Sequence, residues 1–200
     1  MAVPVYGLVL AGGQSRRMQQ DKAFLQYHAL PQYLHAHHLL QKICPQVYLS
    51  CRPDQVEQFQ KLSPEITRVP DQYQDIGPMA ALLSAFQKQK VAWLALACDM
   101  PLIDLDTLAY LLHQREPSAI ATTYQLRDNH FAETLCTIWE PAAYPLLEQA
   151  RQTQQYSLTH LLKQPAVRVL EPKHPTALKN INTPEAYAKA KRKLKQEKPS

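Results

Sequence analysis

The chain has 200 residues, of which 46% are apolar and 20% are charged, and this size and composition are typical of one soluble globular domain. A chain of this length buries about 70% of its unfolded surface on folding, so it needs neither disulfides nor a structural metal. No run approaches the roughly 18 consecutive apolar residues of a membrane span, and the apolar start at residues 3–11 lacks a preceding basic residue. We therefore expect neither a membrane segment nor a signal peptide.

The formal net charge of +5 lies at the end of the chain. The last twelve residues, 189–200, hold one acid and six basic residues: Lys189, Lys191, Arg192, Lys193, Lys195 and Lys198. The rest of the chain is therefore neutral. We interpret 1–188 as the domain and 189–200 as the solvated basic end of a last helix, which is a simpler reading than a nucleic-acid-binding surface.

The four cysteines show no C-x-x-C motif and no paired spacing: Cys44, Cys51, Cys98 and Cys136. This usage favours a reducing, cytoplasmic compartment in which most of the thiols are buried.

Short β-branched or aromatic runs alternate with longer stretches of helical period. Strands are predicted at 5–10, 47–51, 66–69, 92–97, 119–124, 135–139 and 167–170. Helices are predicted at 32–42, 54–61, 78–87, 105–114, 141–150, 158–163 and 184–195. This order predicts a single doubly wound, Rossmann-like α/β sandwich of three layers, with a mostly parallel sheet. Because the second half alternates less cleanly, we expect an antiparallel strand there.

The two most unusual local sequences follow the first and the fourth predicted strands. The first strand runs into Gly12 and Gly13, and the fourth into Cys98, Asp99 and Pro101. In a doubly wound sheet, ligands bind outside the carboxyl ends of the strands, where the strand order reverses. In the common order that crevice lies between the first and fourth strands, so the two sequences should face each other across it.

The loop after the first strand has the composition of a phosphate site. Gly12 and Gly13 let backbone N–H groups approach a phosphate closely, and Arg16, Arg17 and Lys22 add positive charge. Neither the Walker loop nor the dinucleotide fingerprint is present. Taken alone, the segment is better explained as a strand-ending turn followed by a solvated basic loop.

Asp99 strengthens the prediction of a site. A carboxylate directly after a buried strand is costly without a partner, and Mg²⁺ takes one or two carboxylates together with water and phosphate oxygens. The alternative is a cap on the helix that follows, but Asp104 is better placed for that role.

Asp71 follows the third predicted strand and so lies on the same edge of the sheet. A carboxylate can accept two hydrogen bonds from adjacent N–H donors. Guanine presents such a pair on its Watson–Crick edge, whereas cytosine does not. A turn-forming aspartate after Pro70 explains the residue equally well.

Two further groups have structural interpretations. His35, His37 and His38 are scattered around one predicted helix with no carboxylate at ligand spacing, which is typical of packed or exposed histidines rather than a metal site. The segment from Asn180 to Glu185 is typical of a helix cap.

Four motifs resemble those of the molybdenum cofactor guanylyltransferase family, within the nucleotidyltransferase superfamily. Residues 10–22 read L-A-G-G-Q-S-R-R-M-Q-Q-D-K, which is similar to the family's L-A-G-G-x-S-x-R-M-G-x-D-K. Residues 77–80 (G-P-M-A), 98–101 (C-D-M-P) and 180–184 (N-I-N-T-P) resemble G-P-L-A, C-D-M-P and N-x-N-T-P. They occur in family order and span nearly the whole chain.

The resemblance implies a magnesium-dependent enzyme that joins GTP to the phosphate of molybdopterin, forming the guanine dinucleotide of the cofactor and pyrophosphate. It implies catalytic roles for Arg16, Lys22 and Asp99, with Asp99 as the Mg²⁺ ligand. The implied nucleotide-binding residues are Leu10, Ala11, Gly12, Gly13, Lys22, Ser50, Asp71 and Asp99. The implied residues on the molybdopterin side are Gly77, Pro78, Asn180 and Asn182. Molybdoenzymes or cofactor-delivery proteins are possible partners, and a monomer is expected.

Two departures from the family pattern bear on the loops. Gln19 stands where the family has glycine in R-M-G-x-D-K, and Ala81 replaces a frequent glycine after G-P-L-A. Both are places where close backbone approach is expected, so the pterin side is affected more than the nucleotide side. The alternatives are a transferase of the same fold that uses CTP or a sugar phosphate, and a carrier that binds nucleotide or cofactor without catalysis.

Overall fold

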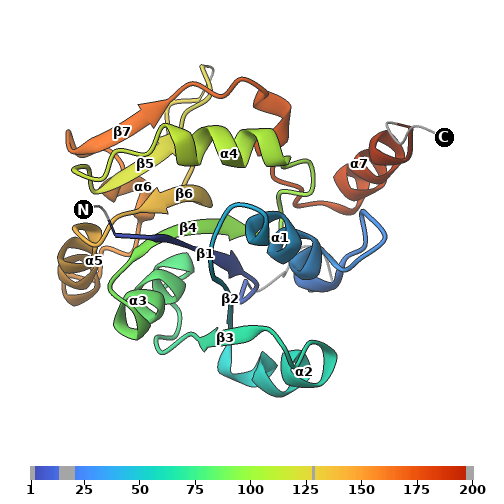
Figure 1. The fold of residues 1–200 in the computed structure, drawn as a ribbon, viewed down its shortest axis with the longest axis horizontal. Helices are drawn as coiled ribbons and strands as arrows, with labels where there is room; N and C mark the ends of the chain where they lie inside the picture. The colour runs from blue at the N-terminus through green and yellow to red at the C-terminus, as the bar shows by residue number, and fades with distance from the viewer. Residues whose placement is uncertain (1–2, 14–20, 128, 197–200) are drawn as a thin grey trace.

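The computed structural model of this chain describes residues 3–13, 21–127 and 129–196. These residues form one seven-stranded sheet in the order β3-β2-β1-β4-β6-β5-β7 (Figure 1). The strands are β1 (Val5–Leu10), β2 (Val47–Cys51), β3 (Thr67–Pro70), β4 (Ala92–Ala97), β5 (Ala121–Tyr124), β6 (Cys136–Trp139) and β7 (Val167–Leu170). Only β6 runs antiparallel to its neighbours, β4 and β5. The predicted α/β class and its antiparallel strand in the second half are confirmed.

The middle of the sheet is buried on both sides, which explains its continuous apolar sequence. All six residues of β4 are buried, and β4 pairs in parallel with β1 from Val5 opposite Ala92 to Leu10 opposite Ala97. The two strands therefore end side by side at one edge of the sheet. This register places the residues that follow Leu10 next to those that follow Ala97.

Helices cover both faces of the sheet (Figure 1). They are α1 (Gln32–Gln41), α2 (Val56–Leu62), α3 (Pro78–Lys88), α4 (Leu105–His113), α5 (Ala143–Gln152), α6 (Leu158–Leu161) and α7 (Pro184–Gln196), with 3₁₀ turns η1 (Lys22–Phe24), η2 (Pro53–Gln55) and η3 (Pro175–Leu178). One core cluster includes Leu40 of α1 and Leu108 of α4, and a second includes Phe86 of α3 and Leu147 of α5. Three layers result.

The observed elements differ from the predicted ones by no more than two residues at either end. One of these differences is at 54–61, where the chain forms the turn η2 before α2 begins. Pro53 begins that turn, and the backbone N–H of Arg52 donates to Gln55 Oε1 at 2.9 Å, so the first residues are held as a separate cap.

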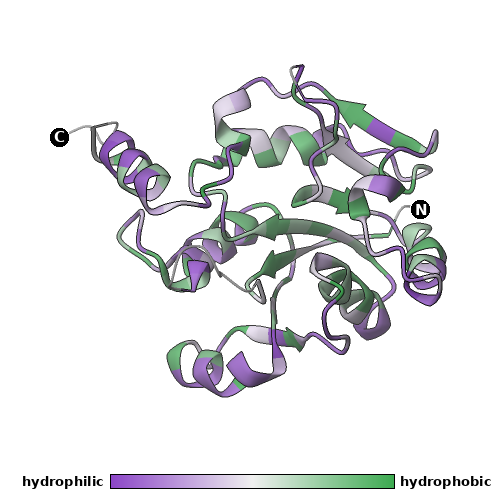
Figure 2. Cartoon of the chain, turned by 180° about the vertical axis from the view of Figure 1, so that it is seen from behind, coloured by the Kyte–Doolittle hydropathy of each residue, from purple (hydrophilic) through white to green (hydrophobic). Residues whose placement is uncertain are grey.

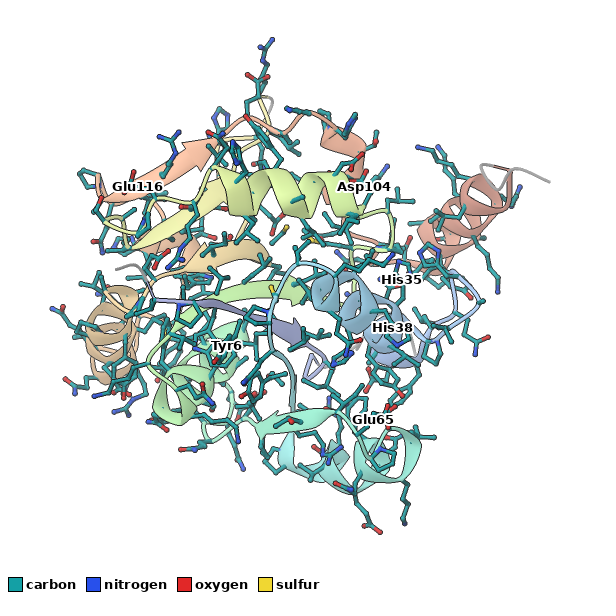
Figure 3. All side chains as sticks on the ribbon, viewed as in Figure 1. Tyr6, His35, His38, Glu65, Asp104 and Glu116 are labelled. Carbon is teal, nitrogen blue, oxygen red and sulfur yellow. The ribbon has the colours of Figure 1, made fainter. Side chains whose placement is uncertain are left out.

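The predicted caps and histidine environments have clear counterparts. Asp104 Oδ1 accepts from the N–H of Thr107 at 2.7 Å and caps α4, as its position in Figure 3 illustrates. Thr183 Oγ1 accepts from the N–H of Ala186 at 3.2 Å and caps α7. His35 stacks on His28 with ring centroids 3.7 Å apart, and burial beside that ring lowers the pKa of His35 to about 4.

Hydropathy follows the layers, with apolar central strands and a largely hydrophilic α7 (Figure 2). The four cysteines are buried and free, as predicted. Within the described ranges, no helix is long and apolar enough to cross a membrane.

Candidate active site

A cleft of about 720 Å³ lies at the carboxyl ends of β1 and β4. The two chain segments stay in contact past their last paired residues, because the N–H of Cys98 donates to the carbonyl of Leu10 at 3.4 Å. The cleft is lined by ten of the predicted site residues: Leu10, Ala11, Gly12, Gly13, Lys22, Ser50, Asp71, Gly77, Pro78 and Asp99. The structure thus brings the glycine turn and Asp99 together on one cavity.

Lys22 and Asp99 form an ion pair inside this cleft, although 77 positions separate them in the chain. Lys22 Nζ lies 3.2 Å from Asp99 Oδ2 and also donates a hydrogen bond to Asn182 Oδ1. The side chains of Lys22 and Asp99 are only 24% and 13% exposed, so their charges are screened less than those of a surface pair. Lys22 is carried by η1, which Asp21 caps by accepting from the N–H of Ala23 at 3.0 Å.

Asp99 has an unused oxygen. Its Oδ1 is buried and has no hydrogen-bond partner among the residues that the structure describes. Asp104 caps α4, so Asp99 is not needed as a helix cap. A buried carboxylate oxygen without a donor is costly, and a hard divalent cation with oxygen ligands would satisfy it. Asp99 therefore fits the role of a Mg²⁺ ligand that leaves the remaining positions to water and phosphate.

Asp71 is held at the end of β3 by backbone and side-chain contacts. Its N–H donates to the carbonyl of Cys51 at 2.8 Å, and its Oδ1 accepts from the Ser50 hydroxyl at 2.7 Å. Burial raises the pKa of Asp71 to about 6, against the hydrogen bond from Ser50 and the charge of Arg52, which both lower it. Asp71 Oδ2 would lie 2.7 Å from a Cβ on Gly12, so a side chain at this position would have to displace that carboxylate oxygen.

Gly77 lines the cleft and directly precedes α3 as its N-cap residue. Its backbone has φ +61° and ψ −147°, a conformation that side-chain-bearing residues rarely adopt. Pro78 follows as the first residue of α3, as predicted for a helix start. Ala81, which replaces a frequent family glycine, is buried and also lines the cleft.

Arg52 is a residue of this site that the sequence reasoning missed. It follows directly after β2, and its Nη1 donates to the carbonyls of Gly12 at 3.2 Å and Gly13 at 3.4 Å. Its Nε also pairs with Asp54 at 3.0 Å. The rule that selected Asp71 and Asp99, the carboxyl end of a strand, would have selected Arg52 as well. Arg52 therefore supports the glycine turn through hydrogen bonds to the carbonyls of Gly12 and Gly13.

Three predicted site residues, Arg16, Asn180 and Asn182, are not among the described residues that line the cleft. Arg16 lies outside the described residues, as do Arg17 and Gln19. Asn180 is exposed and is not among the described residues that line the cleft. Asn182 is not part of the lining either, but it reaches the cleft through its contact with Lys22.

Comparisons with known proteins identify relatives over most of the chain. The family model of the MobA-like NTP transferase domain matches residues 7–169. A molybdenum cofactor biosynthesis bifunctional protein from Synechocystis is 36% identical over 186 residues, which is 92% of this chain and 53% of that protein. The chain thus spans about half of that relative. A molybdenum cofactor guanylyltransferase from Pseudomonas putida is 30% identical over 182 residues, 89% of this chain and 93% of that one.

Solved structures share the fold at lower identity. Molybdopterin-guanine dinucleotide biosynthesis protein A from Archaeoglobus fulgidus superposes with a TM-score of 0.79 at 20% identity, covering 96% of this chain and 99% of that one. A CMP:2-keto-3-deoxy-manno-octonic acid synthetase in complex with CTP superposes with a TM-score of 0.71 at 14% identity, covering 98% and 100%. Both likenesses concern the fold.

Proposed function

This chain belongs to the MobA-like NTP transferase family, and on that premise we propose that it transfers GMP from GTP to the phosphate of molybdopterin. The products are molybdopterin guanine dinucleotide and pyrophosphate. The observation that carries the proposal is the convergence of the Gly12 turn, Lys22 and Asp99 on one cleft. The choice of substrates is supported by relatives named molybdenum cofactor guanylyltransferases that align with nearly the whole chain.

Asp71 supports GTP as the nucleotide. When ionised, its carboxylate accepts hydrogen bonds from the ring N–H and the amino group of guanine, a donor pair that cytosine lacks. Oδ1 accepts one bond from Ser50 and retains a second lone pair, while Oδ2 faces Gly12 in the cleft. Because Ser50 orients the carboxylate before the base arrives, little ordering is needed on binding.

The phosphates would lie along the glycine turn. Gly12 and Gly13 present backbone without side chains, and Lys22 contributes a positive charge at the same wall of the cleft. Arg16 and Arg17 follow the turn in sequence, and we assign them to the β- and γ-phosphates. Asp99 would hold Mg²⁺, which when bound offsets negative charge on the triphosphate.

The chemistry requires positioning rather than a covalent enzyme intermediate, because the molybdopterin phosphate already carries a nucleophilic oxygen. That oxygen forms a bond to the α-phosphorus while the bond from the α-phosphorus to the bridging oxygen breaks, and the electron pair leaves with pyrophosphate. Lys22 and the two arginines stabilise the charge on the leaving group. Gly77, Pro78 and Asn180 are assigned to the molybdopterin side, where they hold the acceptor in line.

We assign the reaction to a reducing cytoplasm, and the four buried, free cysteines support this proposal. The dinucleotide product would then pass to a molybdoenzyme or to a delivery protein.

The test is turnover with molybdopterin and GTP, CTP or UTP, with Mg²⁺ or with excess EDTA. Pyrophosphate release and the mass of the dinucleotide are measured. We expect product with GTP and Mg²⁺ and at least tenfold less with CTP. Product with CTP alone would identify the pyrimidine-specific transferase instead. Tight GTP binding without product from any nucleotide would identify a carrier.

A further inference from the structure

The C-terminal segment reaches the proposed phosphate site, although the family model ends at residue 169. Asn182 Oδ1 accepts a hydrogen bond from Lys22 Nζ across 160 positions of the chain. Directly before it, the N–H of Ile181 donates to the carbonyl of Asp99 at 2.8 Å. The segment therefore contacts both members of the Lys22–Asp99 pair, one through a side chain and the other through the backbone.

Apolar packing between the C-terminal segment and the residues that follow Lys22 holds the contact between Lys22 and Asn182 in place. Ile181 and Ala190 form a small buried cluster with Leu25 and Tyr27, which follow Lys22 by three and five positions. The ring centroids of Tyr27 and Tyr187 lie 4.7 Å apart. In Figure 1, α7 lies beside the loop that follows η1.

A hydrogen bond adds to this packing, because the Tyr187 hydroxyl donates to the carbonyl of Gln26 at 3.1 Å. The helix α7 thus contacts the loop that directly follows η1, the turn that carries Lys22.

Charge explains why an amide suits this position. Asp99 is the partner of Lys22 and also the proposed ligand of a divalent cation, so a bound cation competes with the ammonium group for the same carboxylate. The Asn182 amide oxygen is neutral and remains an acceptor whether or not Asp99 is engaged. It can keep the ammonium group beside the cleft when the electrostatic attraction of Asp99 is reduced.

We propose that Asn182 is a positioning residue for Lys22. The segment 180–196 therefore contributes to the triphosphate site by holding Lys22 in it. This inference rests on the proposed function in one respect, the contact between Lys22 and the phosphates. It changes the place of Asn182, which the family resemblance puts on the molybdopterin side.

The first test is a double-mutant cycle on the Kd for GTP, measured with Mg²⁺ and without molybdopterin. We expect Asn182→Ala to raise this Kd about five- to tenfold and Lys22→Met to raise it about tenfold or more. Because Asn182 acts through Lys22, the double variant should bind GTP no worse than Lys22→Met alone. Effects that multiply would overturn the proposal.

A matched control comes from the same segment. Glu185 is exposed in the first turn of α7, and Glu185→Ala should leave the Kd for GTP unchanged. If Asn182→Ala raises only the KM for molybdopterin and leaves the Kd for GTP unchanged, Asn182 belongs to the acceptor side and the proposal is wrong, while the proposed function stands.

The second test needs no substrate. In a ¹H–¹⁵N spectrum of the lysine ammonium groups, the partly buried and hydrogen-bonded Lys22 should give a signal that exchanges slowly with water, and Lys22→Met identifies it by its loss. Asn182→Ala leaves the ion pair with Asp99 in place but removes one acceptor, so the signal should exchange measurably faster with water, whereas Asn182→Asp, which keeps an oxygen acceptor, should retain the slow exchange. An exchange rate that is unchanged in Asn182→Ala would refute the positioning role, even if GTP proved not to be the substrate.

Discussion

At Gly12, a single added methyl group should weaken nucleotide binding while the protein remains folded. A Cβ added to Gly12 would lie 2.7 Å from Asp71 Oδ2, closer than such contacts occur, and 3.4 Å from the backbone nitrogen of Arg52. The Asp71 carboxylate cannot rotate away without losing its 2.7 Å hydrogen bond from Ser50. Gly12→Ala should therefore displace the carboxylate that we assign to guanine recognition.

The magnitude follows from that bond and from the overlap. A hydrogen bond to a charged group is worth about 1.5–3 kcal/mol, and overpacking costs about 1–3 kcal/mol. If about 1.5–3 kcal/mol is lost from the bound state, the Kd for GTP rises roughly 10- to 140-fold. Gly12 does not have a positive φ, so the backbone itself tolerates alanine.

Gly13→Ala is the matched comparison, because a Cβ on Gly13 would have no atom of the described residues within 4 Å. Gly13 belongs to the proposed phosphate turn, so we expect Gly13→Ala to weaken GTP and CTP by the same factor, whereas Gly12→Ala should weaken GTP more than CTP. Isothermal titration with each nucleotide and Mg²⁺ measures both variants, and thermal unfolding checks that each is folded. Equal weakening of GTP and CTP by Gly12→Ala would show that the contact with Asp71 is not the reason, and the guanine assignment would lose its steric support.

Three further predictions concern charged groups. Asp99→Ala should lower turnover at saturating GTP roughly 10²-fold or more with little change in the melting temperature, and near-normal Mg²⁺-dependent turnover would remove Asp99 as the metal ligand. Because burial raises the pKa of Asp71 to about 6, the Kd for GTP should increase as pH falls through 6, and Asp71→Asn should bind GTP weakly at every pH. The raised pKa makes the contribution of Asp71 to stability greatest at low pH and lost as pH rises through 6, so weaker binding at pH 5 cannot be assigned to unfolding by this group. Glu140, 2% exposed, accepts from Arg115 Nε at 2.6 Å and Nη2 at 2.8 Å, so Glu140→Ala should lower the free energy of unfolding by about 3–5 kcal/mol in urea titration. A loss below about 1 kcal/mol would contradict this prediction and would mean that water solvates the Arg115 guanidinium once Glu140 is removed.

Local sequence determined most of the fold, because its signals depend on near neighbours. The continuous apolar run of β4 indicates burial on both faces, and Gly77 followed by Pro78 indicates a helix start. The carboxyl-end rule then located the cleft, since it needs only the order of strands. The shifted start of α2 reflects the local cap between Arg52 and Gln55, whereas β5 begins at Ala121, where it pairs with β6 and β7.

The contacts within the site were decided by tertiary structure. No pattern in the sequence pairs Lys22 with Asn182 across 160 positions, or predicts the hydrogen bond from the Arg52 guanidinium to the carbonyl of Gly12. The composition around Gly12 predicted a close approach by a phosphate, but not that an Asp71 oxygen lies where a Cβ on Gly12 would stand. Hydrophobic periodicity specifies which face of an element is buried, whereas a hydrogen bond depends on the distance and direction of two groups, which exist only once the layers have packed.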